Sequence, residues 1–201
     1  MLTIGLTGQT GAGKGMFCDA LKEYDGVYCL DTDKIAREVV GKGQPALDEL
    51  AEYFGNEILQ DDGTLNRRKL ASIAFCDEEK HSKLNEITHF YIKQKTLERL
   101  NLAKKMQASA AIIDAPLLFE SRLDKICDFT VGVIADKQTR LKRIMFRDGI
   151  DEKNAKIRIE AQPDDEFFRK SCTYILENDS TSEEFCKKVL EFAAQHNILQ
   201  E

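Results

Sequence analysis

Several features that would point to a membrane or to nucleic acid are missing from this sequence. Its longest apolar stretches are about the length of one strand, and no basic segment followed by an apolar run opens the chain. We therefore expect neither a membrane span nor a signal peptide. Acidic residues outnumber basic residues by 35 to 29, giving a formal net charge of −6. Such a chain has no long-range attraction for the phosphate groups of nucleic acids or membrane surfaces, so we expect neither as a partner. Because a signal peptide is also lacking, we expect a cytoplasmic location.

Cysteine and histidine patterns typical of metal sites are also lacking. Long, irregular gaps separate the six cysteines, none forms a C-x-x-C pair, and the three histidines are scattered. These spacings exclude the usual zinc and redox motifs. We interpret most of the cysteines as buried free thiols in a reducing compartment. Three prolines and twelve glycines leave no room for a long disordered linker, so the 201 residues predict a single unit.

Short apolar runs alternate with helical patterns along the chain. Runs typical of buried strands occur at residues 2–7, 27–30, 110–114, 129–134 and 174–176. Helical spacing predicts helices over about 16–22, through 34–107 with one long helix over about 90–106, over 136–162 and over 182–196. This alternation, without hairpin signals, predicts an α/β fold with a parallel sheet between two layers of helices. Asn66 is a predicted N-cap.

The strongest motif is a glycine-rich turn between the first strand and the first helix. Residues 8–14 read GQTGAGK and match G-x-x-x-x-G-K, in the context that a P-loop needs. Its backbone N–H groups and the helix N-terminus would bind phosphate oxygens, and Lys14 can reach the β- and γ-phosphates. The predicted nucleotide-binding residues are Gly8, Gly11, Ala12, Gly13, Lys14, Gly15 and Met16.

One position departs from the P-loop pattern. The residue after the lysine is normally Ser or Thr, whose hydroxyl binds Mg²⁺, but here it is Gly15. Because Mg²⁺ keeps several waters in proteins, a water could fill the vacancy. We expect metal binding to be weakened or rearranged.

Three carboxylates lie at the ends of predicted strands. Asp31 and Asp33 follow the second strand, where a carboxylate could accept the proton of an attacking hydroxyl or hold magnesium through water. Helix capping by Asp31 or Thr32 explains the same residues equally well. Asp114 ends the third strand and resembles a Walker B acid that binds Mg²⁺ or its waters, although a turn residue before Pro116 is the alternative.

A basic helix follows the fourth strand. Arg140, Arg143 and Arg147 fall on one face by helical spacing. Arginine suits the charge on transferring phosphates, whereas a solvated surface is the alternative. With the P-loop, the arginines favour a lid over residues 139–169. A helical insertion would occupy 34–107 over the carboxyl edge of the sheet, and the core of this single unit would comprise 1–33, 108–138 and 170–201.

Short motifs follow one another in order along nearly the whole chain. They are residues 4–8 (IGLTG) with the P-loop lysine, 31–33 (DTD), 35–40 (IAREVV), Gly43, 45–47 (PAL), 54–55 (FG), 62–67 (DGTLNR), 87–89 (ITH), 116–120 (PLLFE), Gln138, Arg140, 158–159 (RI) and Gln162. A P-loop alone indicates only a nucleotide, and this ordered series is far more specific. The series resembles the dephospho-CoA kinase family.

The resemblance implies transfer of phosphate from ATP, with Mg²⁺, to the ribose 3′-hydroxyl of dephospho-CoA, which is the last step of coenzyme A synthesis. It implies that Asp33 is the base, that Lys14 holds ATP phosphates and that Arg140 closes over them from the lid. It also implies that Asn178 lies near adenine. The residues that it implies for the CoA portion are Arg67, His89 and Leu118.

The chain departs from the family pattern at a few positions. Besides Gly15, Phe90 replaces the proline usual after Thr-His, and Cys172-Thr173 stands where Ala-Asp is common. Two other functions remain open at this level: a nucleoside or nucleotide kinase of the same fold, and a non-catalytic nucleotide-binding module, which only Gly15 favours.

Overall fold

The computed structural model describes residues 1–199, which fold into two compact units. The first contains residues 1–30 and the described residues from 101 onward, and the second contains residues 31–100. None of the helices in residues 1–199 has the length and apolarity needed to cross a membrane.

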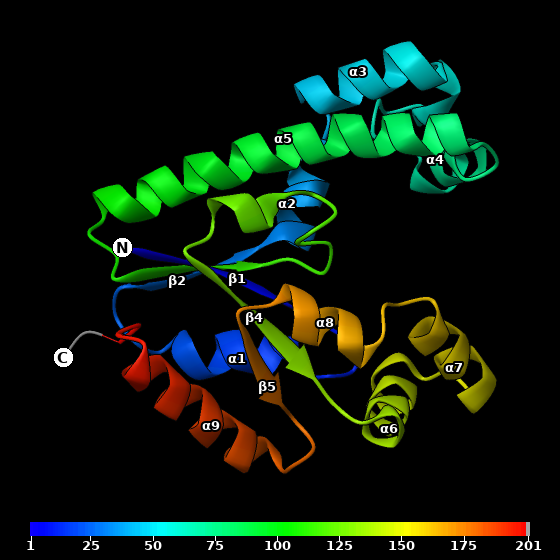
Figure 1. The fold of residues 1–201 in the computed structure, drawn as a ribbon. Helices are drawn as coiled ribbons and strands as arrows, with labels where there is room; N and C mark the ends of the chain where they lie inside the picture. The colour runs from blue at the N-terminus through cyan, green and yellow to red at the C-terminus, as the bar shows by residue number, and fades with distance from the viewer. Residues whose placement is uncertain (200–201) are drawn as a thin grey trace. The chain divides into compact units, whose positions relative to one another are not determined.

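A five-stranded sheet is the centre of the first unit (Figure 1). Its strands are β1 (Leu2–Gly8), β2 (Val27–Asp31), β3 (Ala110–Asp114), β4 (Phe129–Ile134) and β5 (Tyr174–Glu177), in the order β2-β3-β1-β4-β5. β1 pairs in parallel with β3 on one side and β4 on the other. The five predicted strands and the parallel α/β fold are confirmed. The central position of β1 matters because ligands bind where the strand order reverses, beyond the carboxyl ends of the strands.

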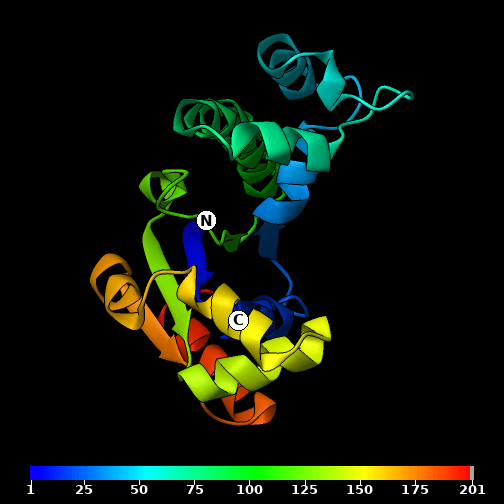
Figure 2. The ribbon, with the colours of Figure 1, turned by 90° about the vertical axis from the view of Figure 1, so that its right-hand side faces the viewer.

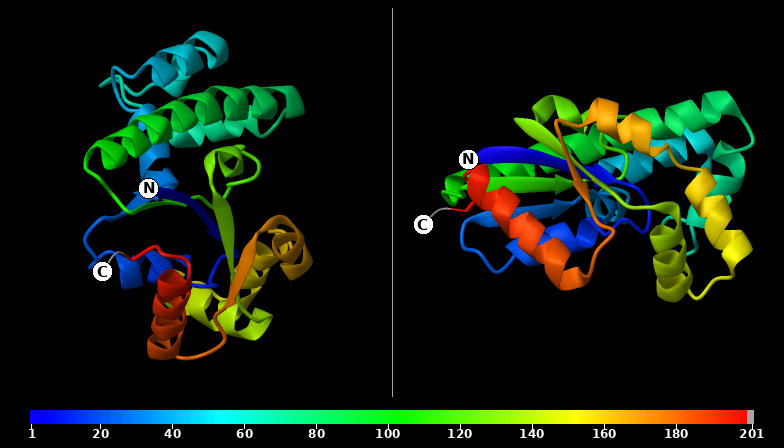
Figure 3. Two further views of the ribbon diagram at one scale, coloured as in Figure 1. Left: turned by 60° about the vertical axis from the view of Figure 1, so that its left-hand side comes forward. Right: turned by 60° about the horizontal axis from the view of Figure 1, so that its bottom comes forward.

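Two helices cover one face of this sheet. α1 (Lys14–Leu21) and α9 (Ser182–Gln195) pack together against it (Figure 3). Their apolar sides bury Phe17 and Phe185 completely. Burial of one such side chain stabilises a fold by about 1.5–3 kcal/mol. A capping box between Thr181 and Glu184 fixes the start of α9.

Smaller elements lie against other parts of the first unit. α8 (Asp165–Ser171) places Phe168 against Ile134 of β4. The short 3-10 helix η2 (Leu123–Ile126) follows a turn that contains the completely buried Leu118.

The basic segment after β4 forms two helices instead of one. α6 (Lys137–Asp148) ends at Gly149, whose φ of 62° is left-handed, and α7 (Glu152–Glu160) begins after the N-cap Asp151. The prediction of one helical stretch over 136–162 is therefore wrong in this detail. The two helices lie side by side (Figure 2). They share an apolar cluster of their own that includes Ile144 and Ile159.

The second unit is helical, as predicted. It contains α2 (Thr32–Val39), α3 (Pro45–Phe54), the 3-10 helix η1 (Asn56–Ile58), α4 (Arg67–Ala74) and most of α5 (Glu78–Lys105), which continues into the first unit. Asn66 caps α4 by accepting a hydrogen bond from the Lys69 N–H, as predicted. α5 begins about three turns before the predicted start near residue 90.

All six cysteines are free thiols, but only Cys172 is buried. Cys29 and Cys76 are exposed, which corrects the expectation of mostly buried thiols. Cys18 and Cys29 lie close together, and the pKa of the Cys18 thiol is raised by its hydrogen bond with Cys29 and by burial.

Candidate active site

The P-loop (residues 8–15) connects β1 to α1 at the reversal in strand order. Three of its glycines, Gly8, Gly11 and Gly13, have backbone angles and neighbours that exclude a side chain, and a Cβ on Gly11 (φ 77°) would lie 2.9 Å from the Arg140 carbonyl oxygen. A Cβ on Gly8 (φ 144°) would lie 2.1 Å from the Val133 carbonyl oxygen, and one on Gly13 (φ 97°) would lie 2.3 Å from Asn178 Nδ2. The loop is therefore closely surrounded by β4 and by the turn that follows β5.

The predicted nucleotide-binding residues all lie on this loop or in the first turn of α1: Gly8, Gly11, Ala12, Gly13, Lys14, Gly15 and Met16. Lys14 begins α1 and its Nζ donates to the Gly8 carbonyl oxygen at 3.2 Å. This contact holds the ammonium group over the loop, where phosphate oxygens would lie.

Arg140 lies beside the P-loop and is almost completely buried, with 4% of its surface exposed. Its Nε donates to the Thr10 carbonyl oxygen at 3.0 Å, while its Nη2 has no hydrogen-bond partner among the described residues. Burial lowers the pKa of Arg140 below its ordinary value, and the nearby Asp165 opposes this shift. A buried guanidinium with an unused donor beside a phosphate-binding loop suits an anionic ligand.

The three arginines on one side of α6 have three different environments. Arg143 donates to the Asn178 carbonyl oxygen at 2.9 Å, to Asn178 Oδ1 at 3.3 Å and to the Ser180 carbonyl oxygen at 3.4 Å. Arg147 instead forms an ion pair with Asp148 at 2.7 Å. Only Arg140 therefore combines burial with a spare donor at the P-loop.

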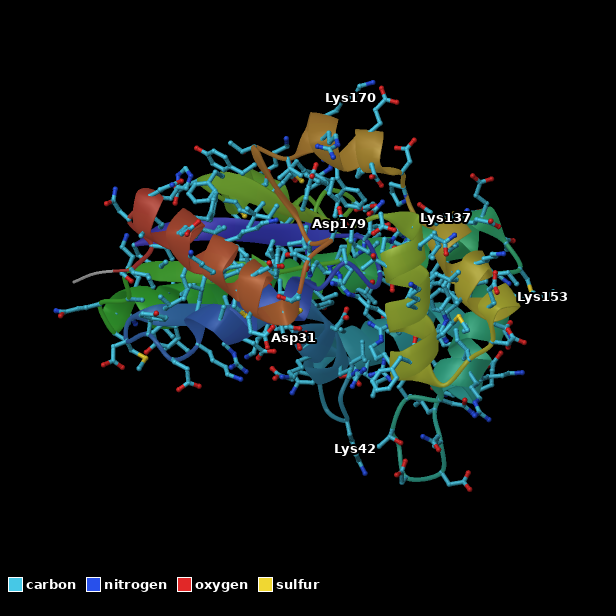
Figure 4. All side chains as sticks on the ribbon, turned by 90° about the horizontal axis from the view of Figure 1, so that it is seen from below. Asp31, Lys42, Lys137, Lys153, Lys170 and Asp179 are labelled. Atoms are coloured by element: carbon cyan, nitrogen blue, oxygen red, sulfur yellow. The ribbon has the colours of Figure 1, made fainter. Side chains whose placement is uncertain are left out.

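Asn178 belongs to the turn after β5 and has no exposed surface. Its Nδ2 donates to the Ala12 carbonyl oxygen at 2.7 Å. The next residue, Asp179, accepts from the Asp136 N–H at 2.7 Å, so the turns after β4 and β5 are joined (Figure 4 labels Asp179 between β5 and α9). In this conformation Asn178 is hydrogen-bonded to the P-loop backbone, so it would affect nucleotide binding by positioning that loop.

Asp114 and Leu118 lie near the end of β3. Asp114 is the last residue of the strand and is opposite Leu6, two residues before the P-loop begins. Leu118 has no exposed surface and packs where a Cβ on Gly5 would meet its Cδ2 at 2.8 Å. Its implied part in substrate binding stays a prediction.

Three predicted site residues belong to the second unit. Asp33 is exposed in the first turn of α2, while Asp31 is the N-cap that accepts from the Lys34 N–H at 3.0 Å. Capping therefore accounts for Asp31 and leaves the Asp33 carboxylate available. Arg67 begins α4 and is exposed, and His89 lies half-buried on α5.

Sequence reasoning missed the contacts between the P-loop and the connection from α7 to α8. The Thr10 N–H donates to Gln162 Oε1 at 2.5 Å, and Gln9 Nε2 donates to Asp165 Oδ1 at 2.6 Å. Gln9 is buried and also accepts from the Ala135 N–H at 3.5 Å. An amide side chain at a variable P-loop position is the one signal that could have suggested such a partner.

Comparisons with known proteins agree on one family. A family model described as dephospho-CoA kinase matches residues 2–184. The dephospho-CoA kinase of Corynebacterium glutamicum is 41% identical over 184 residues, which are 92% of this chain and 92% of that protein. That of Shouchella clausii is 37% identical over 194 residues, covering 96% of this chain and 98% of the relative.

Solved structures that resemble this chain include a dephospho-CoA kinase. Dephospho-CoA kinase from Campylobacter jejuni has a TM-score of 0.71 and 27% identity, covering 97% of this chain and 98% of its own. Shikimate kinase from Bacteroides thetaiotaomicron, with a TM-score of 0.54, 15% identity and 98% coverage of both chains, shares the fold alone. Since the family model spans most of the chain and the relatives match along most of their length, this chain belongs to the dephospho-CoA kinase family.

Proposed function

We propose that this chain uses ATP to phosphorylate the ribose 3′-hydroxyl of dephospho-CoA, forming coenzyme A. The observation that carries the proposal is the family match over residues 2–184, which includes the P-loop and every predicted site residue. The same match supports ATP as the phosphate donor. A cytoplasmic location, without a nucleic-acid partner, remains part of the proposal.

ATP phosphates would bind to the first unit. The P-loop would supply backbone N–H groups and the N-terminus of α1, and Lys14 would supply a positive charge. The spare Nη2 of the buried Arg140 would donate to a phosphate oxygen, which would give this guanidinium the partner that it lacks among the described residues. Preorganised donors of this kind stabilise the charge that spreads over the transferred group.

Mg²⁺ fits this site as an ion carried mainly by the nucleotide. Among residues 1–199, no group of three or more His, Cys, Asp or Glu side chains could hold a metal by itself. Mg²⁺ usually keeps several waters and takes one or two carboxylates together with substrate phosphates. Asp114, at the end of the strand beside β1, would be its protein ligand through water. When bound there, Mg²⁺ would supply neutralisation of the negative charge on the ATP phosphates.

Asp33 would accept the proton of the attacking hydroxyl. Its carboxylate is exposed, and the neighbouring Asp31 already performs the capping that the helix requires. Proton acceptance by a positioned carboxylate typically contributes about 10²–10⁴-fold to a rate. Arg67, His89 and Leu118 would bind the CoA portion.

The direct test incubates purified protein with Mg-ATP and an equimolar mixture of dephospho-CoA and the common nucleosides, followed by mass spectrometry. We expect the mass of one added phosphate on dephospho-CoA alone. Phosphorylated nucleosides would replace the proposal with a nucleoside kinase. ATP binding without any product would replace it with a non-catalytic nucleotide-binding module.

A further inference from the structure

The carbonyl group of Ala12, within the P-loop, is held from one side by two side chains. Asn178 Nδ2 donates to it at 2.7 Å and Arg143 Nη1 at 3.5 Å. Both donors come from outside the loop, one from the turn after β5 and the other from α6. An interior P-loop carbonyl thus has its direction fixed by the surrounding fold.

The direction of this carbonyl also fixes the direction of the next N–H. All the described peptide bonds are trans, so the C=O of Ala12 and the N–H of Gly13 point in opposite directions from one rigid plane. A carbonyl that points toward Asn178 leaves the Gly13 N–H pointing away from it. P-loops bind phosphates through backbone N–H groups that converge on the inside of the loop. Because the Ala12 carbonyl points to donors from outside the loop, the opposite direction of the Gly13 N–H favours such convergence.

Arg143 determines which end of the Asn178 amide faces the P-loop. An Asn side chain has a donor end and an acceptor end, whereas a guanidinium can only donate. Because Arg143 Nη2 donates to Asn178 Oδ1, the oxygen must face Arg143 and the NH₂ group must face Ala12. Asn178 is completely buried, so water cannot replace either partner without a rearrangement.

We propose that Arg143 is a positioning residue for nucleotide binding, which acts through Asn178 on the peptide between Ala12 and Gly13. It keeps the Gly13 N–H directed at the phosphates before ATP arrives. It also holds the turn after β5 through the carbonyl oxygens of Asn178 and Ser180. The ATP phosphates of the proposed function are the ligand, and Arg143 itself does not contact them.

The test measures ATP affinity by calorimetry, without acceptor, for the wild type, Arg143→Gln, Arg143→Lys and the control Lys142→Gln. Lys142 is an exposed neighbour on α6, so its substitution removes one positive charge of the same helix. We expect Arg143→Gln to bind ATP about tenfold more weakly, which corresponds to the loss of one charge-assisted hydrogen bond. Arg143→Lys should fall between this variant and the wild type, and Lys142→Gln should match the wild type.

Two further readouts separate positioning from a general loss of structure. In glycine-labelled protein, the Gly13 amide resonance should move in nucleotide-free Arg143→Gln and stay in place in Lys142→Gln. The KM for dephospho-CoA and kcat at saturating ATP should change less than about twofold, since the defect is in ATP binding.

The proposal is overturned by wild-type ATP affinity with an unmoved Gly13 resonance, or by equal losses of affinity for ATP and for dephospho-CoA. If Arg143→Gln does not fold, the same two criteria apply to Arg143→Lys, which is the milder change. Because ATP binding is measured without acceptor, failure of the wild type to form coenzyme A would contradict the proposed function and leave this test intact.

Discussion

Gly15 is the residue at which this P-loop differs most from the usual pattern, and the structure does not require a glycine there. The position is exposed, its φ lies outside the left-handed region, and a Cβ would meet nothing within 4 Å. Gly8 and Gly13 are different, because their backbone angles and close neighbours exclude a side chain. A serine hydroxyl at position 15 should therefore fit.

We expect Gly15→Ser to raise the affinity of the nucleotide-bound protein for Mg²⁺, because the hydroxyl would replace a water ligand without the cost of fixing that water. Titration of Mn²⁺ into the complex with a non-hydrolysable ATP analogue, followed by electron paramagnetic resonance, measures this affinity. Gly15→Ala adds the carbon without the hydroxyl and should behave as the wild type. Superimposable titrations for all three proteins would show that water already serves adequately.

Asp33→Asn should keep ATP binding and lose most turnover, about 10²–10⁴-fold, because the amide cannot accept the hydroxyl proton. The substitution preserves size and leaves the N-cap Asp31 in place, so α2 should keep its structure. Calorimetry gives the ATP affinity, and initial rates at saturating substrates give the turnover. Unchanged turnover would remove Asp33 from the role of base.

Residue-level prediction from the sequence succeeded where one local pattern determines the chemistry. The P-loop is such a pattern, since its glycines and lysine occur in one continuous segment. The partners of that loop were not predictable, because Gln162 and Asn178 are 152 and 166 positions away from the P-loop residues that they contact. Their polar side chains carry no sign in the sequence of which distant carbonyl or amide they will meet.

At the level of elements, Asp148 at the end of α6 connects α6 to α7 through ion pairs. Arg147 on α6 and Arg158 on α7 both donate to the Asp148 carboxylate. The hydrogen bond from Arg147 is the main cause that lowers the pKa of Asp148 below its ordinary value of 3.8, while burial opposes the shift. A carboxyl whose pKa is lower in the folded state stabilises the fold above its unfolded pKa, and the effect is lost as the pH falls through the folded value.

Asp148→Asn should therefore lower the melting temperature at pH 7, and the difference from the wild type should shrink as the pH falls below 3.8, the ordinary pKa. Circular dichroism melts at several pH values from 7 to well below 3.8 measure this difference. Glu160→Gln is a matched control on α7, because its pair with Lys137 is exposed and should contribute little at any pH. A difference that stays constant with pH would mean that Asp148 acts without its charge.

The ends of secondary-structure elements were predicted well from the sequence where the hydrophobic pattern determines them. They were predicted poorly where capping residues determine them. The strands are short apolar runs, and the structure has them within about one residue of the predicted ends. The break between α6 and α7 was missed because charged and apolar residues continue at helical spacing through it, while Gly149 and the cap Asp151 end one helix and begin the next. α5 was predicted too short because its first turns are rich in polar residues.

At the scale of the whole molecule, the order of motifs along the chain carries more information than any one of them. A P-loop fold is shared with kinases that act on unrelated acceptors, such as the shikimate kinase from Bacteroides thetaiotaomicron, at 15% identity. The match to dephospho-CoA kinases extends over residues 2–184 and includes the helical unit, in which Asp33, Arg67 and His89 lie. The assignment of dephospho-CoA as the acceptor therefore depends on the match over residues 2–184, because a P-loop alone does not identify the acceptor.

Phosphorus NMR of the product formed from dephospho-CoA and Mg-ATP directly tests which atom is phosphorylated, with Lys14→Met as the inactive control. We expect a new phosphomonoester signal coupled to the proton on the 3′ carbon of the ribose, produced by the wild type and absent with the control. A phosphate on another hydroxyl, or no new ester although ATP binds, would contradict the proposed function.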